Sequence, residues 1–555
     1  MLTLLALMAV APAATFNVNT TLDIAGVCGL SCSLRQAVGS ANANPGPDTI
    51  QLMVGTYNLT LVGAGEDANA TGDLDITGPT TILGPVGPGV RVIDGGWNDR
   101  IFHVTTGAAL TVRRVMLRNG SESNRGGGIL ANGDLTLTDV RMGSNRDLGA
   151  RPYNDSTGGA AWVAGDLWAV NSTFEGNRAT HGRGGAVWVG GDATVAGCTF
   201  DENSVWWGGQ GGALFVTGAA TISDSTFETN DATALPSGTG LPLPVGGGQG
   251  GALFTAGSAA LQGVDLRYNG GTEGGAWYAL GASTFSGGDV SYNDASVDGG
   301  GVFLFGDLVM DLATVTNNTS ASAGTWAFTG GGGIFGWYSS VELIDTTLDA
   351  NIATGGRGGG LAILSGDADV TGSTLSANGA DSGAAVYVQG SLAAVNSTFS
   401  GNVSEDPAGI VALWPSGGLP VTADFVNCTF GFNETDAAGT PDALSLDPTG
   451  GAITVENTLI LDGCLAALTS ADHNLETGNT CGLTGANDLP STPMVVGVLF
   501  NNGGPTKTHQ IGPATAARGA ARYATCIGAD VGGVDQRGVS RLSPLSVCDI
   551  GAYEY

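Results

Sequence analysis

Carboxylates, arginines and a histidine gather around one insertion in the sequence. Three of them precede one glycine pair and three precede the next: Asp147, Arg151 and Asp155, then Arg178, His181 and Arg183. A lyase that acts on uronates needs a base to remove a proton and a cation to neutralise the carboxylate. A glycoside hydrolase needs two carboxylates about 5 to 9 Å apart. The set therefore contains the groups that either reaction requires.

Other sequence features argue against catalysis by this cluster. The phrases typical of polygalacturonases (NTD, adjacent DD, GHG and RIK) do not occur in the chain. We therefore interpret the cluster as a solvated turn, and an enzyme that acts on polysaccharides (a uronate lyase, hydrolase or epimerase) stays the alternative. No metal or other cofactor is expected. The acidic turn at 72–75 could hold a structural calcium ion weakly, but no nine-residue GGxGxD repeat supports a calcium site.

An aromatic residue recurs at the fifth position after most glycine pairs. Its neighbours on both sides, such as Val187 and Val189, are aliphatic. Because side chains alternate faces along a strand, aliphatic residues that face inward would turn the rings outward, where they could stack on sugars or dock a protein. The alternative is an internal aromatic stack with the aliphatic column under a loop. The candidate ligand-binding residues are Trp162, Trp188, Phe215, Phe254, Tyr278, Phe303, Phe335 and Tyr387.

These residues belong to a phrase that recurs about ten times. Residues 184–203 read GGAVWVGGDATVAGCTFDEN, and residues 211–230 read GGALFVTGAATISDSTFETN. Spacings of 24 to 39 residues indicate a solenoid, a propeller or an array. The density of glycine excludes helical repeats, and most units are shorter than the roughly 40 residues of a propeller blade. The units end at Asn145, Asn177, Asn203, Asn230, Asn269, Asn293, Asn318, Asn351, Asn378 and Asn402.

Each unit contains three short alternating segments, for example 186–189, 193–195 and 198–200. Three strands and three turns in about 25 residues predict one coil of an all-β, right-handed parallel β-helix, a pectin-lyase-like solenoid of about 12 or more coils. Glycines permit tight corners, and the asparagines are expected to form a hydrogen-bonded ladder along the coils. The Phe of each Thr-Phe pair is expected in the core. The insertions at 147–157, 231–249 and 321–330 fall at one corner.

The composition limits the possible partners. The chain has 50 acidic and 19 basic residues, and 42% of its residues are hydrophobic. The hydrophobic share is ample for a core, so the chain is not disordered. Its net charge of −31 repels nucleic acids and anionic lipids, so nucleic-acid binding is not expected.

The first residues and the cysteines point to an oxidising compartment. The apolar stretch that ends in Ala-Pro-Ala-Ala predicts a secretory signal at 1–14, and no later segment has the length of a transmembrane helix. Local disulfides are expected because the paired CxxC spacing of zinc sites is missing. Cys198 and Cys428 are expected to be buried thiols that pack like small apolar residues. The expected disulfides are Cys28 with Cys32, Cys464 with Cys481, and Cys526 with Cys548.

Both ends carry specific phrases. CSLRQA at 32–37, followed by GDLDIT at 72–77, resembles the CSLREA-type opening of bacterial secreted β-helix proteins, with Gln36 in place of the usual glutamate. NNGGPTKTHQI at 501–511 and CDIGAYE at 548–554 resemble the choice-of-anchor domain. No apolar tail or sorting signal follows, so covalent anchoring is not expected. The central repeats are similar to those of chlamydial polymorphic membrane proteins, and this resemblance implies adhesion.

The expected organisation is a signal peptide at 1–14, an N-terminal cap at 15–75, β-helix repeats at 76–465 and a choice-of-anchor-like domain at 466–555. The expected function is that of a secreted or cell-surface binding protein, adhesin-like, which recognises glycans or other macromolecules without catalysis. The alternatives are the polysaccharide-active enzyme and a structural surface or matrix component.

Overall fold

The computed structural model confirms the predicted fold class, an all-β parallel β-solenoid of about 12 turns. The only helices in the described part of the chain are α1 (Leu34–Ala43) and α2 (Tyr523–Cys526). Most of the expected signal peptide, residues 1–12, lies outside the described residues. The structure describes residues 13–149, 156–207, 209–233, 247–321, 329–405, 409–415, 421–435, 442–444, 451–465, 467–542 and 545–555.

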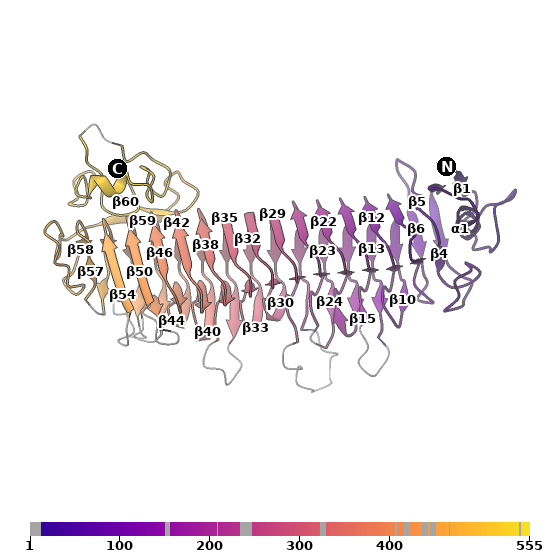
Figure 1. Cartoon of the computed structure of the whole chain (residues 1–555), viewed down its shortest axis with the longest axis horizontal. Coiled ribbons are helices and arrows are strands. Elements are labelled where there is room, and N and C mark those ends of the chain that lie inside the picture. The colour runs from indigo at the N-terminus through magenta and orange to yellow at the C-terminus, as the bar shows by residue number, and fades with distance from the viewer. Residues whose placement is uncertain are drawn as a thin grey trace, which may run out of the picture. The chain divides into compact units, whose positions relative to one another are not determined.

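The chain forms two compact units. Unit 1 comprises residues 1–248 and 252–254, and unit 2 comprises residues 249–251 and 255–555. The expected boundaries at 75 and 465 stay predictions. In both units each full coil contributes strands to three sheets, called A, B and C, whose strands are labelled in part in Figure 1.

Sheet A of unit 1 contains two strands from most coils. The first series is β1 (Thr15–Asn17), β2 (Asp48–Gln51), β5 (Thr80–Leu83), β8 (Leu110–Arg113), β12 (Leu135–Thr138), β17 (Leu167–Val170), β22 (Ala193–Ala196) and β26 (Ala220–Ser223). The second is β3 (Gly55–Asn58), β6 (Arg91–Asp94), β9 (Met116–Arg118), β13 (Arg141–Gly143), β18 (Thr173–Glu175), β23 (Thr199–Asp201) and β27 (Thr226–Glu228).

Sheets B and C complete the coils of unit 1. Sheet B contains β4 (Leu74–Ile76), β7 (Phe102–Val104), β11 (Ile129–Ala131), β16 (Ala161–Val163), β21 (Val187–Val189), β25 (Leu214–Val216) and β28 (Leu253–Thr255). Sheet C contains β10 (Ser121–Glu122), β14 (Arg146–Asp147), β19 (Arg178–Ala179) and β24 (Ser204–Val205), and a separate pair is formed by β15 (Ser156–Thr157) and β20 (Gly182–Arg183).

Sheet A of unit 2 begins with three nine-residue strands, in which the two segments of a coil are continuous. These are β29 (Ala259–Arg267), β32 (Ser283–Ser291) and β35 (Leu308–Thr316). The others are β38 (Val341–Ile344), β39 (Thr347–Asp349), β42 (Ala368–Thr371), β43 (Thr374–Ser376), β46 (Leu392–Val395), β47 (Thr398–Ser400), β50 (Val421–Val426), β51 (Thr429–Gly431), β54 (Gly451–Glu456), β55 (Leu459–Ile460), β57 (Thr469–Ser470) and β58 (Leu475–Glu476).

The remaining strands of unit 2 follow the same plan. Sheet B contains β31 (Trp277–Ala279), β34 (Val302–Leu304), β37 (Ile334–Trp337), β41 (Leu361–Leu364), β45 (Val386–Val388) and β49 (Val411–Leu413). Sheet C contains β30 (Gly270–Glu273), β33 (Asp294–Asp298), β36 (Thr319–Ala321), β40 (Ile352–Arg357), β44 (Gly379–Ser382), β48 (Val403–Ser404) and β52 (Glu434–Thr435). Two small pairs are β53 (Asp442–Leu444) with β56 (Gly463–Cys464), and β59 (Val496–Phe500) with β60 (Thr508–Ile511).

Successive coils pair in parallel and in register, so equivalent residues lie against each other. Phe174 in β18, Phe200 in β23 and Phe227 in β27 are fully buried, and neighbouring rings stack with centroids 4.5 Å apart. The predicted core role of this column is therefore confirmed. The glycine pair permits an equally close approach of the backbone: Gly184 has φ +64°, and a Cβ on Gly185 would lie 1.9 Å from the carbonyl oxygen of Gly212.

The predicted asparagine ladder is also present. Asn145 Nδ2 donates to Asn177 Oδ1 at 3.0 Å, and Asn177 Nδ2 donates to Asn203 Oδ1 at 3.0 Å. Asn177 Nδ2 also donates to the carbonyl oxygen of Met142 at 2.9 Å. All three asparagines are fully buried. The ladder thus provides hydrogen bonds for buried amides that the turn leaves outside the sheet ladders.

In unit 2, the C-terminal segment folds back onto the outer face of sheet A (Figure 1). Gln536 donates to Thr374 Oγ1 at 2.9 Å and accepts from Thr398 Oγ1 at 2.6 Å. His509 Nε2 lies 2.9 Å from Ser400 Oγ. These contacts join residues more than 100 positions apart, so the segment covers coils that precede it in the chain.

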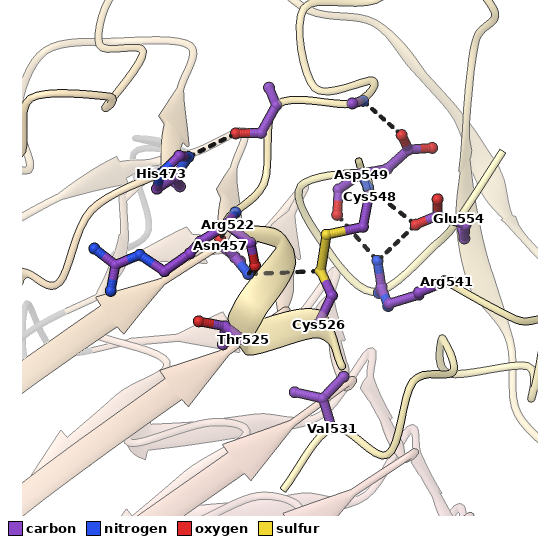
Figure 2. Close-up of a disulfide and its surroundings, with 12 residues drawn as sticks. Asn457, His473, Arg522, Thr525, Cys526, Val531, Arg541, Cys548, Asp549 and Glu554 are labelled. Carbon is purple, nitrogen blue, oxygen red and sulfur yellow. Dashed lines mark hydrogen bonds and ion pairs between the residues drawn. A yellow bond between two sulfur atoms is a disulfide. The ribbon is translucent and has the colours of Figure 1, made fainter. Parts of the chain in front are cut away.

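All three predicted disulfides are formed: Cys28 with Cys32, Cys464 with Cys481, and Cys526 with Cys548. Figure 2 shows the last of these beside Asn457 and the buried Arg541. Arg541 forms an ion pair of 3.0 Å with Glu554 and donates to the carbonyl oxygen of Gly551 at 2.6 Å. No helix in the described ranges has the length and apolarity to cross a bilayer.

Replacement of Asn177 by alanine is expected to destabilise unit 1 by about 2–4 kcal/mol, because it removes the hydrogen bonds that the Asn177 side chain makes to the buried amide groups of Asn145, the carbonyl group of Met142 and Oδ1 of Asn203. Urea denaturation and amide hydrogen exchange of the coils around 145–203 would measure the loss. The control is Thr194→Ala on the exposed face of β22, for which a change below about 0.5 kcal/mol is expected. Equal stability of the two variants would contradict a stabilising ladder.

Candidate functional site

The aromatic column lies on the face of sheet B that points away from the core. In β31, Trp277 contacts Phe285 of sheet A across the core, with ring centroids 6.4 Å apart. Because side chains alternate along a strand, the adjacent Tyr278 points to the opposite face. The rings therefore point outward, as the alternation predicts.

The turns that precede the glycine pairs cover this column. Arg125 lies over the Trp162 ring at 5.0 Å, and Arg357 Nη1 donates to the hydroxyl of Tyr387 at 2.7 Å. Only Trp188 is partly exposed. The expected exposed ribbon is therefore wrong for the other seven rings, each at most 9% exposed: Trp162, Phe215, Phe254, Tyr278, Phe303, Phe335 and Tyr387.

Asp147 of the cluster interpreted as a solvated turn is not solvated and has a structural role. It is fully buried, and its carboxylate accepts from the backbone amides of Gly149 at 3.1 Å and Thr157 at 2.7 Å. These residues flank the insertion, so the carboxylate ties the two ends of the insertion together. Arg151 and Asp155 of the cluster lie outside the described residues.

The other members of the cluster do not converge on one point. His181 stacks on Trp207, with ring centroids 5.7 Å apart. Arg183 donates through Nε to Gln210 Oε1 at 2.9 Å. Arg178 lies over a different aromatic ring, described next. The described members of the cluster therefore do not form the acid, base and cation set that the alternative, a polysaccharide-active enzyme, would need.

Two arginines and two tryptophans form a continuous row along sheet C. Arg146 in β14 and Arg178 in β19 are register partners in neighbouring coils. The guanidinium carbon of Arg146 lies 4.2 Å from the centre of a Trp97 ring, and that of Arg178 lies 3.8 Å from the centre of a Trp206 ring. These distances are typical of cation–π contacts. The four residues are called the Arg–Trp row below.

No described residue of the protein neutralises the positive charge of this row. Neither Arg146 nor Arg178 has a carboxylate within 4.0 Å among the described residues. Arg146 donates to Ser121 Oγ at 3.1 Å, whereas Arg178 Nε is buried and finds no partner within the described ranges. Burial and the charge of Arg146 both lower the pKa of Arg178. An anion bound here would supply the missing hydrogen bond and relieve the repulsion.

The surrounding sequence has a charge opposite to that of the whole chain. Residues 91–183 contain eleven arginines and nine acidic residues, a net charge of +2 in a chain of net charge −31. Association with an anion is favoured where positive charge is concentrated locally. The coils that carry the Arg–Trp row are therefore the part of this acidic protein best suited to an anionic ligand.

Three carboxylates surround Arg100 beside the row. Its guanidinium lies 3.5 Å from Asp73 and 3.3 Å from Glu122. Burial and the nearby Asp99 raise the pKa of Asp73 to about 7, and burial and the contact with Glu122 raise that of Asp99 to about 6. Because Asp99 and Glu122 hydrogen-bond directly, this pair lacks the 5–9.5 Å gap that hydrolases require.

His103 joins two further carboxylates, and these three are the candidate metal ligands. Its Nδ1 lies 3.2 Å from Asp67 and 3.3 Å from Asp75. Asn132 Nδ2 contacts His103 Nε2 at 3.2 Å, an arrangement that leaves the proton of a neutral ring on Nδ1. The hydrogen bond with Asp75 raises the pKa of His103. Protein hydrogen bonds therefore account for the arrangement of these groups.

The chain matches no protein-family model, and no curated protein matches it. The fold and the Arg–Trp row define it as a parallel β-solenoid with a basic and aromatic surface whose two arginines have no carboxylate partner among the described residues. Trp97, Arg146 and Trp206 were not among the residues singled out from the sequence. The sequence could have predicted that the two arginines are neighbours, because Arg146 and Arg178 each follow a ladder asparagine directly.

Asp73→Asn is expected to change the pH dependence of stability. A raised pKa means that the folded state keeps a proton that the unfolded state releases, so this contribution to stability is lost as the pH rises from about 4 to about 7. At pH 8 the variant should exceed the parent by on the order of 1–3 kcal/mol, with little difference at pH 4.

Thermal unfolding and hydrogen exchange of the N-terminal coils at both pH values would measure this effect. Glu202→Gln, at an exposed position, is the control and should leave the difference between the two pH values unchanged. An unchanged pH dependence in Asp73→Asn would contradict the assignment of the buried proton.

Proposed function

We propose that the protein is an extracellular, adhesin-like β-solenoid that binds an anionic polysaccharide through the Arg–Trp row. The observation that carries this proposal is the register pair Arg146 and Arg178, which has no described carboxylate partner and lies between Trp97 and Trp206. Guanidinium groups bind carboxylates and sulfates through paired hydrogen bonds, and tryptophan edges and faces contact sugar rings.

The dimensions of the row suit an extended ligand. Trp97 and Trp206 lie four coils apart along unit 1, about 19 Å at the spacing of neighbouring strands. Trp97 is 41% exposed, so part of its ring is accessible to a ligand. A polymer that carries a charge on most sugars could contact both arginines and a tryptophan at once.

Further support comes from the sequence and the disulfides. The resemblance to CSLREA-type secreted proteins, to choice-of-anchor domains and to chlamydial polymorphic membrane protein repeats implies a role outside the cytoplasm and, for the last of these, adhesion. Three disulfides are compatible with that location. The expected signal peptide at 1–14 would direct the chain there.

Binding of the full chain to polygalacturonate, a sulfated glycan and neutral dextran would test the proposal. Titration calorimetry at low and high salt should show affinity for the anionic polymers alone, which weakens as the salt concentration rises. Arg146→Gln and Arg178→Gln should each weaken binding about five- to thirtyfold, because each removes a charge-assisted contact of about 1–2 kcal/mol.

The matched control is Arg267→Gln in unit 2, whose guanidinium is already paired with Asp265 and Asp289. Its affinity should equal that of the parent. Tight binding of dextran, or unchanged affinity in both row variants, would overturn the proposal. The appearance of unsaturated uronate or new reducing ends would instead support the polysaccharide-active enzyme.

A further inference from the structure

A second basic site lies on sheet A of unit 1. It is a pocket of about 380 Å³ whose wall includes the side chains of Arg91, Arg114 and Arg141. They come from three successive coils: Met116 in β9 is the register partner of Arg141 and of Val92, which follows Arg91. Arg114 precedes β9 at a corner where its φ is +57°. The coil repeat therefore gathers three arginines around one apolar residue.

Two of these arginines have no counter-ion. Among the described residues, no carboxylate lies within 4.0 Å of Arg91 or Arg114, whereas Arg141 is paired with Glu175. Backbone carbonyl groups orient the two: Arg91 donates to Gly87 and Arg114 donates to Gly84 at 3.0 Å. Carbonyl groups fix the guanidinium planes but do not neutralise their charge.

An unused donor points to a missing ligand group. The Nε atom of Arg91 is buried and has no hydrogen-bond partner in the part of the chain that the structure describes. A buried donor without a partner costs roughly 1–3 kcal/mol, more when it is charged. An oxygen from a bound anion in the pocket would satisfy this donor and neutralise the excess charge at the same time.

We propose that this pocket binds the carboxylate-bearing ring of a single acidic sugar, a uronate residue. The volume lies within the range of small-ligand pockets. The planar guanidinium groups suit a carboxylate, which accepts two parallel hydrogen bonds. Pro85, Val115 and Met116 supply apolar surface for the face of the ring, and Asp139 supplies an acceptor for sugar hydroxyl groups.

The pocket is separate from the Arg–Trp row. The row follows sheet C along the coils, so it suits a polymer, whereas the pocket lies on sheet A and its volume of about 380 Å³ suits a single ring. A uronate monosaccharide should therefore bind here without help from Arg146 or Arg178. The two sites are distinguished by their ligands and by their variants.

Titration of the full chain with galacturonate and glucuronate, with glucose, inorganic phosphate and sulfate as comparison ligands, tests the inference. Ligand-observed NMR and calorimetry should show binding of a uronate and none of glucose, with phosphate and sulfate at most weak competitors. Arg91→Gln and Arg114→Gln should each reduce uronate affinity at least tenfold. Arg91→Lys, which keeps the charge but loses the fork, should fall between the parent and Arg91→Gln.

Arg113→Gln is the matched control, because Arg113 is exposed beside Arg114 and does not line the pocket. It should bind uronates as the parent does, and thermal unfolding should show that all variants are folded. Equal uronate affinity in Arg91→Gln, Arg114→Gln and the control would overturn the inference. So would binding of glucose as tight as that of galacturonate, or binding of phosphate and sulfate without uronate.

Discussion

The constraint on which this structure depends is the register of neighbouring coils, which sets equivalent residues about 4.8 Å apart along a column. Every side chain therefore meets its own counterpart, and only residue types that tolerate such a neighbour can recur. Phenylalanine does so by stacking, as Phe200 does on Phe174. Asparagine does so by donating and accepting at once, as Asn177 does between Asn145 and Asn203. The stacked phenylalanines of the core and the asparagine ladder at the corner therefore follow from the same constraint.

This register disfavours like charges, because it places them next to each other in neighbouring coils. The chain contains an aspartate column and an arginine column, and the two are stabilised differently. Asp134 and Asp166 lie in one exposed column, and each carboxylate accepts from a backbone amide of the next coil, at 3.0 and 2.9 Å. These bonds stabilise the negative charges in place. Arg146 and Arg178 have no comparable arrangement, since their partners are ring faces and one hydroxyl group. Ring faces attract the cations but leave their net charge in place.

Features that repeat could be predicted from the sequence, and features that depend on the loops could not. The coil, the ladder and the core phenylalanines follow from the period. The burial of Tyr387 under a turn does not follow from it. Alternation along a strand predicts which face of the sheet a ring lies on, but it does not predict whether a turn covers that ring. For Cys198 the sequence predicted the burial but not the hydrogen bonding. The residue is buried as expected, but its thiol accepts from the Ser172 amide at 3.4 Å. In the next coil, Ser225 occupies the same column and accepts through its hydroxyl group. Cys198 therefore replaces a serine, not an apolar residue.

The placement of the arginines is the strongest physical argument for a ligand. A chain with 50 acidic residues has ample means to pair each arginine with a carboxylate, and it does so for Arg267 and Arg541. In sheet C the register instead sets Glu122 beside Asp147, and arginine beside arginine. The neighbouring arginines repel each other, and this repulsion opposes folding. An anion that binds the arginine column recovers that free energy in the complex, where it contributes to affinity.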